Sequence, residues 1–373
     1  MKKFLSALVV FCMIMSTSLV AFAAEAPTTA EVEGKIQGAG EYVGTSTGTY
    51  GVANAYNFER LVRSGADTSA YNGAFVQDVK NNLSANSGKL IVSVYDYVTN
   101  TNVDVESITY YAAVIRALDE IGEDPTEIDG VDLTAKFLTY DASAVVDNPY
   151  LYANIIEIAS LYGDDDLAKS YVDALITNYY TMGSGLNYWG YSCDNTAHFI
   201  EAIAQYGDDY QAYLDDAINV VKTYKLDKGY FADTTYTTSA NADSTGLALQ
   251  AFCLAYPNSD LITEDDLAET YALLSNFETE SNGVYGFTDN TTPNAYATAD
   301  ALMGLGEYLP YLYQNTLAGN LNEITPEPAT QPETKKEEVK KSPATGISTL
   351  SFAFAVAFAG AGTISTITKR KYK

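Results

Sequence analysis

The chain of 373 residues is strongly acidic, with 48 Asp and Glu side chains against 21 Lys and Arg and a formal net charge of −27. Such a surface repels phosphate backbones, which excludes nucleic acid as a partner and favours solubility outside the cell. One histidine and three cysteines are too few to supply a structural zinc site, so neither a metal nor another cofactor is expected.

Residues 1–23 have the pattern of a secretory signal peptide. Lys2 and Lys3 precede an apolar run that is short for a membrane anchor, and the run ends in a small-x-small cleavage site at residues 21–23. After cleavage only Cys193 and Cys253 remain, and we favour two core residues over a disulfide. Residues 24–49 are rich in Gly, Thr and Glu without a clear period, so they are predicted to form an N-terminal arm.

A segment of small and apolar residues recurs six times between residues 50 and 316. The small residue that anchors each copy lies at Ala55, Ala112, Ala153, Ala197, Gly246 and Ala299. Each copy predicts a helix that is covered by its neighbours, and amphipathic segments such as 264–274 alternate with the copies. Six such helical hairpins predict an all-α toroid, a double ring with one helix of each pair inside.

Glycine and aspartate mark the predicted turns between helices. Gly122-Glu-Asp, Gly163-Asp-Asp-Asp and Gly207-Asp-Asp are each expected to end one helix with the glycine and to begin the next with acids. A calcium-binding or catalytic cluster at residues 164–166 is the alternative. Helix caps are favoured because all three motifs occur where a cap is required.

Residues 282–287, Asn-Gly-Val-Tyr-Gly-Phe, followed by residues 294–302 resemble the repeat of the prenyltransferase and squalene-cyclase α/α toroids. The resemblance is clearest over 186–310 and implies an (α/α)6 barrel with a ligand cavity at its centre. The chemistry of that family does not carry over. Its zinc site needs a His on a later repeat than the Cys, whereas His198 lies five residues from Cys193, and the nearest match to the cyclase acid motif, residues 164–166, lies in a capping turn. The resemblance therefore implies a fold without its activity.

Three columns of the repeated helix form one polar face, because their positions are spaced i, i+4 and i+7. The first column is Val52, Thr109, Tyr150, Asp194, Asp243 and Tyr296; the second is Tyr56, Ala113, Asn154, His198, Leu247 and Asp300; the third is Glu59, Arg116, Glu157, Glu201, Gln250 and Met303. On inner helices this face would line a lumen, and on outer helices it would be solvated surface.

An aromatic turn with Tyr188, Trp189 and Tyr191 precedes the fourth copy. Flat rings with a polar edge bind sugars or planar macrocycles. We therefore place a ligand among nine residues, with the two glutamates deepest. They are Tyr150, Asn154, Glu157, Trp189, Asp194, His198, Glu201, Asp243 and Tyr296.

Three functions remain open for this site, and no catalytic residue is assigned. The first is non-catalytic binding of a glycan, a corrinoid or another small molecule. The second is an extracellular glycan-processing hydrolase or lyase, with Asp194 and Glu201 as an acid/base pair or His198 with Tyr191. The third is an adhesin or spacer that binds a protein, in which side chains would plug the lumen.

The C-terminal segment predicts attachment to a cell wall. Ser342-Pro343-Ala-Thr345-Gly346 precedes an uncharged apolar span, 347–367, and a basic tail. This order resembles the sorting signal of Gram-positive surface proteins, with Ser342 where the commonest version has Leu. The resemblance implies that a membrane-tethered precursor is cut after Thr345 by a sortase and joined to peptidoglycan. Residues 317–341, rich in Pro, Glu and Lys, are predicted to be a disordered linker that spans the wall.

Overall fold

The computed structural model describes residues 27–47, 50–96, 99–139, 148–233, 235 and 237–323. The predicted signal peptide, the sorting motif at residues 342–346 and the apolar span 347–367 all lie outside these residues. The chain divides into two compact units between Leu309 and Pro310, within the long helix α13 (Ala295–Glu323). That helix ends at Glu323 and so includes the first part of residues 317–341, which were predicted to be a disordered linker.

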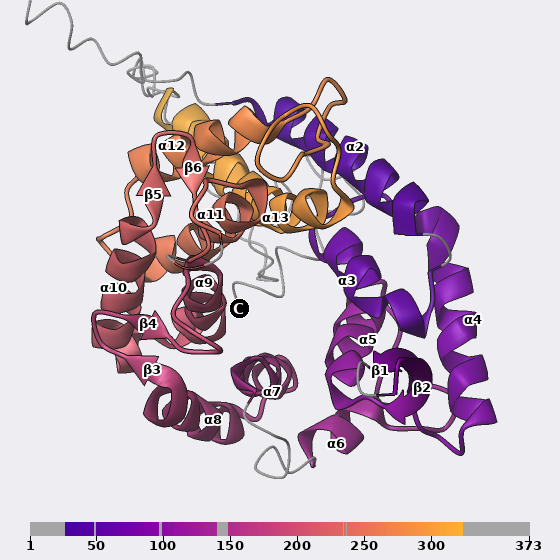
Figure 1. Cartoon of the computed structure of the whole chain (residues 1–373). Coiled ribbons are helices and arrows are strands. Elements are labelled where there is room, and N and C mark those ends of the chain that lie inside the picture. Colours follow the sequence, from indigo (N-terminus) through magenta and orange to yellow (C-terminus); the bar gives the residue numbers. More distant parts are fainter. Residues whose placement is uncertain are drawn as a thin grey trace, which may run out of the picture. The chain divides into compact units, whose positions relative to one another are not determined.

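Helices of the first unit alternate between an inner and an outer ring (Figure 1). The inner ring consists of α3 (Ala55–Arg63), α5 (Ile108–Glu120), α7 (Pro149–Leu161), α9 (Cys193–Ile203), α11 (Ala242–Ala255) and the start of α13. The outer ring consists of α2 (Thr29–Thr47), α4 (Ser69–Ala85), α6 (Leu133–Leu138), α8 (Asp165–Tyr179), α10 (Gly207–Thr223) and α12 (Glu264–Leu274). This is the predicted all-α toroid, in which each hairpin has one inner and one outer helix.

The small anchor residues all lie on the inner helices. Ala55, Ala112 and Ala299 are fully buried, whereas Ala153 is half-buried. At Gly246 a Cβ atom would lie 2.7 Å from the Cα of Ala301, so the backbones of α11 and α13 are in contact. Small residues recur because neighbouring inner helices approach closely.

The prediction of an N-terminal arm over residues 24–49 is wrong, because Thr29–Thr47 form helix α2. Its buried residues Val32, Ile36, Ala39 and Val43 are spaced as on one face of a helix. The glycines between them, Gly34, Gly38 and Gly40, conceal this period in the sequence. Helix α2 is the outer helix of the first hairpin, and Lys35 pairs with Glu278 beyond α12, which joins the first hairpin to the last.

Short antiparallel ladders connect the outer helices to the inner ones. They are β3 (Tyr180–Thr181) with β4 (Gly185–Leu186) and β5 (Lys225–Leu226) with β6 (Gly229–Tyr230). A longer hairpin, β1 (Ile91–Asp96) with β2 (Thr101–Glu106), was not predicted. One-turn 3₁₀ helices lie at η1 (Val52–Asn54), η3 (Ala204–Tyr206), η4 (Tyr256–Asn258) and η5 (Ser275–Phe277).

A threonine directly before the anchor residue secures three of these turns. Thr196, Thr245 and Thr298 accept hydrogen bonds from the backbone amides of Leu186, Tyr230 and Tyr285, at 3.3, 2.9 and 3.0 Å. The same contact in these three successive repeats sets where α9, α11 and α13 begin relative to the turn before each of them.

Only the Gly163 motif shows both predicted features, a left-handed glycine and an acid that caps the next helix. Gly122 ends α5, but α6 begins at Leu133 with Asp132 as its N-cap. Gly122 and Gly163 have φ values of 84° and 79°, and Asp164 caps α8 by accepting a hydrogen bond from the amide of Leu167 at 3.1 Å. Gly207 differs, because it is the helical first residue of α10 with φ of −48°. Among the described residues, no group of three or more His, Cys, Asp and Glu could hold a metal ion.

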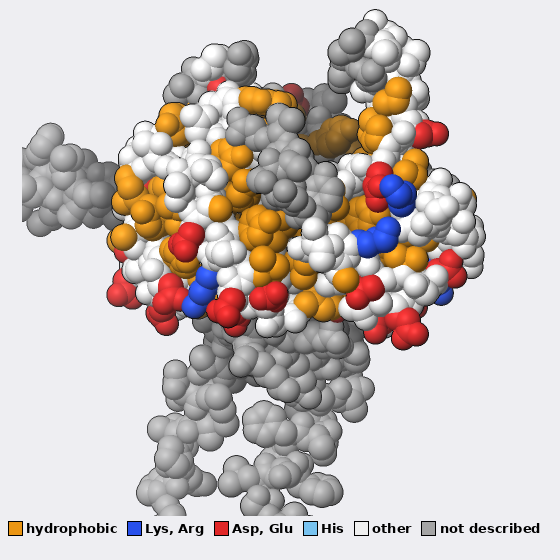
Figure 2. All heavy atoms as spheres, turned by 90° about the horizontal axis from the view of Figure 1, so that it is seen from below, with side chains coloured by type: hydrophobic (Ala, Val, Ile, Leu, Met, Phe, Trp, Pro, Cys, Tyr) orange, Lys and Arg blue, Asp and Glu red, His pale blue; other side chains and the backbone are white. Residues whose placement is uncertain are grey.

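The described surface is acidic, and none of the described helices is both long and apolar enough to cross a membrane. On the face drawn in Figure 2, red Asp and Glu side chains outnumber the blue Lys and Arg side chains. Cys193 is buried and Cys253 is partly buried, and they do not form a disulfide with each other.

Candidate functional site in the lumen

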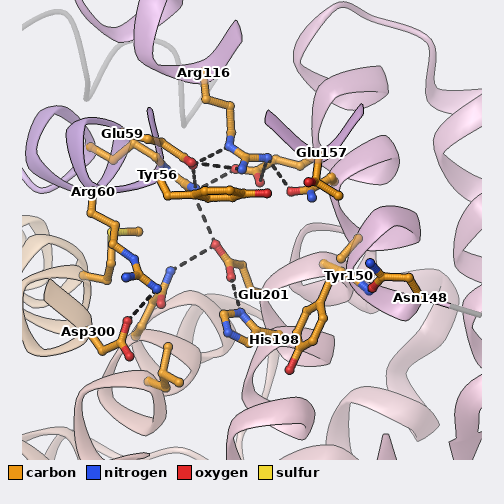
Figure 3. Close-up of a pocket in the computed structure, with 18 residues that line it drawn as sticks. Tyr56, Glu59, Arg60, Arg116, Asn148, Tyr150, Glu157, His198, Glu201 and Asp300 are labelled. Carbon is orange, nitrogen blue, oxygen red and sulfur yellow. Dashed lines mark hydrogen bonds and ion pairs between the residues drawn. The ribbon is translucent and has the colours of Figure 1, made fainter. Parts of the chain in front are cut away.

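A cavity of about 370 Å³ lies among the inner helices (Figure 3). It is lined by Tyr56, Glu59, Arg60, Arg63, Thr109, Arg116, Asn148, Tyr150, Ala153, Asn154, Glu157, His198, Glu201, Ala202, Leu247, Gln250, Asp300 and Met303. The lining includes the whole third column and all of the second except Ala113. The polar face of the repeats therefore lines a lumen and is not outer surface.

Two arginines and three glutamates from different helices form an ion-pair network on one wall of the cavity (Figure 3). Arg116 pairs with Glu59 and also lies 3.2 Å from Glu157. Arg63 lies 3.0 Å from Glu59, 2.8 Å from Glu157 and 3.4 Å from Glu201. Each arginine thus bridges carboxylates of neighbouring inner helices, and the network ties α3, α5, α7 and α9 together.

The network keeps buried charges ionised. Arg116 is 7% exposed and Glu59 is 4% exposed, so either charge alone would be costly to bury. Burial lowers the pKa of Arg63 and Arg116, but the surrounding glutamates outweigh it and raise both pKa values. Both guanidinium groups are therefore permanent hydrogen-bond donors in the cavity.

His198 and Glu201 form a second pair, with 3.1 Å between Nδ1 and Oε2. Burial lowers the pKa of His198, but the hydrogen bond and the charge of Glu201 outweigh it and raise the pKa. Burial likewise opposes ionisation of Glu201, yet His198 and Arg63 lower its pKa to about 2. Gln250 donates to the other carboxylate oxygen at 3.0 Å, so both oxygens of Glu201 have a partner in the cavity wall.

Three aspartates lie near one another at the N-terminal ends of the last inner helices. Asp300 lines the cavity and pairs with Arg60 at 2.7 Å. Burial raises the pKa of Asp243 to about 7, and the charges of Asp300 and Asp194 add to the effect. Burial also raises the pKa of Asp194. One buried oxygen of Asp194 and one of Asp243 have no hydrogen-bond partner.

Five of the nine predicted site residues line the cavity, and four do not. The five are Tyr150, Asn154, Glu157, His198 and Glu201. Asp194 and Asp243 are close enough to Asp300, which does line the cavity, for its charge to raise their pKa values. Trp189 and Tyr296 are 91% and 72% exposed. Whether any of the nine binds a ligand stays a prediction.

Arg60, Arg63 and Asn148 line the cavity but were not predicted to do so. Glu59 and Arg116 also line it, and they were not included in the predicted site although both belong to the third column. Arg63 follows Glu59 by four residues on α3, so extending the polar face by one helical turn would have found it. Arg60 lies off the columns, and only its ion pair with Asp300 brings it to the cavity.

No protein-family model matches the chain, and no curated protein does. Among solved structures it is similar to a polysaccharide lyase, at 12% identity and a TM-score of 0.51, over 76% of this chain and 98% of the other. A glycosyl hydrolase family 88 protein from Bacteroides vulgatus matches at 12% identity and a TM-score of 0.52, over 76% and 100%. A type II terpene cyclase from Scytonema matches at 12% identity and a TM-score of 0.51, over 76% of this chain and 98% of the other.

These similarities define the class of fold. The chain has the architecture of the α/α toroids, as the resemblance of its repeats implied. At such low identity the similarity shows the fold alone, because one fold carries many chemistries. Function has to be argued from the cavity.

Proposed function

We propose that the toroid binds a neutral carbohydrate of one or two sugar rings in its lumen. The observation that carries this proposal is the balance of charge in the cavity lining. The lining contains three guanidinium groups, one imidazole ring and four carboxylates; they are Arg60, Arg63 and Arg116, His198, and Glu59, Glu157, Glu201 and Asp300.

Paired charges of both signs suit a hydroxyl-rich, uncharged ligand. Sugar hydroxyls both donate and accept, and this wall offers charged donors and charged acceptors side by side. Tyr56 and Tyr150 add flat rings against which the C–H face of a sugar can pack. A volume of about 370 Å³ lies within the range of small-ligand sites. The charged wall disfavours an isoprenoid, which needs an apolar cavity.

Calorimetric titration with matched sugars tests the proposal. Glucose, N-acetylglucosamine, maltose and cellobiose represent neutral ligands, while glucuronate and glucosamine test an anion and a cation. We expect a neutral sugar to bind. His198→Ala should lower its affinity about tenfold, as for the loss of one good hydrogen bond. Lys89→Ala, which changes an exposed side chain of a surface ion pair with Glu106, is the matched control and should bind normally. Binding of charged sugars only, or of none, would contradict the proposal.

A second candidate function, glycan processing, is supported by the pKa values. Acid/base catalysis uses pairs of groups whose surroundings drive their pKa values apart. The pKa of Asp194 is raised by burial, and that of Glu201 is lowered to about 2. Solved toroids of similar fold include a polysaccharide lyase and a glycosyl hydrolase. Reducing ends released from polysaccharides by the wild type, but not by Asp194→Asn or Glu201→Gln, would establish this function, and no release by the wild type would exclude it for those substrates.

We also propose that the protein is exported and joined to the cell wall through Thr345. The order of sorting motif, apolar span and basic tail supports this. A wall-digesting enzyme should be needed to release the mature protein from cells. Complete extraction by detergent alone would show that residues 347–367 are simply an anchor.

A further inference from the structure

We infer that Trp189, stacked on Tyr188, forms a second sugar subsite outside the lumen, so that the ligand is an oligosaccharide with one end in the cavity. This inference rests on the proposed carbohydrate function and extends it to the length of the ligand. Three observations carry it: the exposure of Trp189, the construction of its turn, and a continuous series of aromatic contacts that leads into the cavity.

Trp189 is 91% exposed, more than any other large hydrophobic side chain among the described residues. Its φ of 55° lies in the left-handed region, which is unfavourable for a bulky residue. A large apolar ring held exposed in a disfavoured backbone conformation points to a functional constraint at this position.

The turn that carries the ring is rigidly built. The buried Asn195 donates two hydrogen bonds from Nδ2, to the carbonyls of Tyr188 at 3.1 Å and Gly190 at 3.0 Å. The side chain of Asn187 accepts from the amide of Gly190 at 3.1 Å. Because helix α9 supplies Asn195, the turn is fixed directly to the inner ring.

A series of ring contacts connects the exposed indole with the cavity. Trp189 and Tyr188 are stacked with centroids 4.6 Å apart and an interplanar angle of 18°. The ring of Tyr188 packs edge-on against Tyr150 at 5.3 Å, and Tyr150 packs edge-on against His198 at 5.2 Å. Tyr150 and His198 both line the cavity. The platform is therefore continuous with the proposed sugar site.

The platform fits a sugar ring better than a protein surface. Tyr188 stacks beside the indole, and most of the Trp189 side chain stays open to solvent. Tyr191, two residues further along the chain, is 38% exposed, and its hydroxyl donates to Oγ1 of Thr181 at 3.1 Å. A flat apolar face with a polar rim matches the C–H face and the hydroxyl edge of a pyranose.

The chain contains a single tryptophan, so its fluorescence reports on this subsite alone. We would titrate the full chain with two ladders, glucose to maltohexaose and N-acetylglucosamine to chitohexaose, by calorimetry and by emission. Short members should bind without changing the emission, and longer members should shift it to the blue. Trp189→Ala should lower the affinity for the longest bound sugar about three- to tenfold and leave the affinity for the shortest unchanged.

The control variant is Tyr95→Ala, which removes a 49% exposed ring from the β1–β2 hairpin and should leave all affinities unchanged. Circular dichroism of both variants checks folding. Long sugars that bind Trp189→Ala and the wild type equally, with no emission shift, would overturn this inference and leave the lumen proposal intact. Binding of no sugar in calorimetry would overturn both, and an emission shift caused only by a protein would assign the platform to a protein partner.

Discussion

The guanidinium group of Arg116 contacts three side chains of the lumen, which are Glu59, Asn154 and Glu157. Replacing it by Met leaves Glu59 buried with less compensating charge. We predict that Arg116→Met lowers the free energy of unfolding by about 3–5 kcal/mol, the usual cost of breaking a buried pair from one side. Urea denaturation measures this value. Lys89→Met, which breaks an exposed pair, should cost less than about 1 kcal/mol.

A loss below about 1 kcal/mol for Arg116→Met would show that the network adds nothing to stability. The double variant Glu59→Gln/Arg116→Met removes both partners, so it should recover part of the loss. Recovery would place the cost on the unpaired carboxylate and not on lost packing.

The raised pKa of Asp243 predicts that the stability of the protein depends on pH. The pKa of this carboxyl is raised to about 7 in the folded protein, so the folded state binds a proton that the unfolded state, with a pKa near 4, has already released. The contribution of Asp243 to the free energy of unfolding is therefore fully present below about pH 4, and it is lost as the pH rises to about 7. Asp243→Asn should remove this slope and exceed the wild type in stability at pH 8 by an amount on the order of 1–3 kcal/mol.

Unfolding curves of both proteins between pH 4 and 8 test this prediction. The exposed Asp260→Asn serves as the control and should follow the wild type. Parallel curves for wild type and Asp243→Asn across this range would contradict the raised pKa.

At the scale of the element, two glycines in helices should respond oppositely to Ala. On α11, a Cβ at Gly246 would lie 2.7 Å from the backbone of Ala301, and backbone cannot move aside, so Gly246→Ala should cost about 1–3 kcal/mol. On α4, a Cβ at Gly73 would meet nothing within 4 Å, so Gly73→Ala should stabilise by about 0.5–1 kcal/mol. Thermal unfolding measures both. Equal effects would mean that α11 and α13 are not in such close contact.

Local signals predicted some elements and concealed others. The small residue at each inner helix follows from close helix packing, so the repeat located α3, α5, α7, α9, α11 and α13. Helix α2 was missed because three glycines, which disfavour helix, lie between its buried residues. The cap at Asp164 could be predicted because it needs only neighbouring residues. The helical conformation of Gly207 was not predicted; a Cβ there would lie 2.9 Å from the side chain of Asn258, a neighbour that is distant in sequence.

At the scale of the whole molecule, the polar columns could be predicted but their partners could not. Helical spacing placed His198 and Glu201 on one face of α9, and they do form a pair. The arginines that complete the network come from α3 and α5, and only closure of the ring brings them to Glu157 and Glu201. The exposure of Trp189 likewise depends on how its turn is fixed to α9.

His198 is the only histidine of the chain, so a tag-free protein gives one set of imidazole resonances, from inside the lumen. Nitrogen-detected NMR of this ring tests the central claim, that the lumen binds a neutral sugar, most directly. The account predicts a pKa above the ordinary value and imidazole resonances that move when a bound neutral sugar is added. A sugar that binds by calorimetry while these resonances stay unchanged would contradict the account.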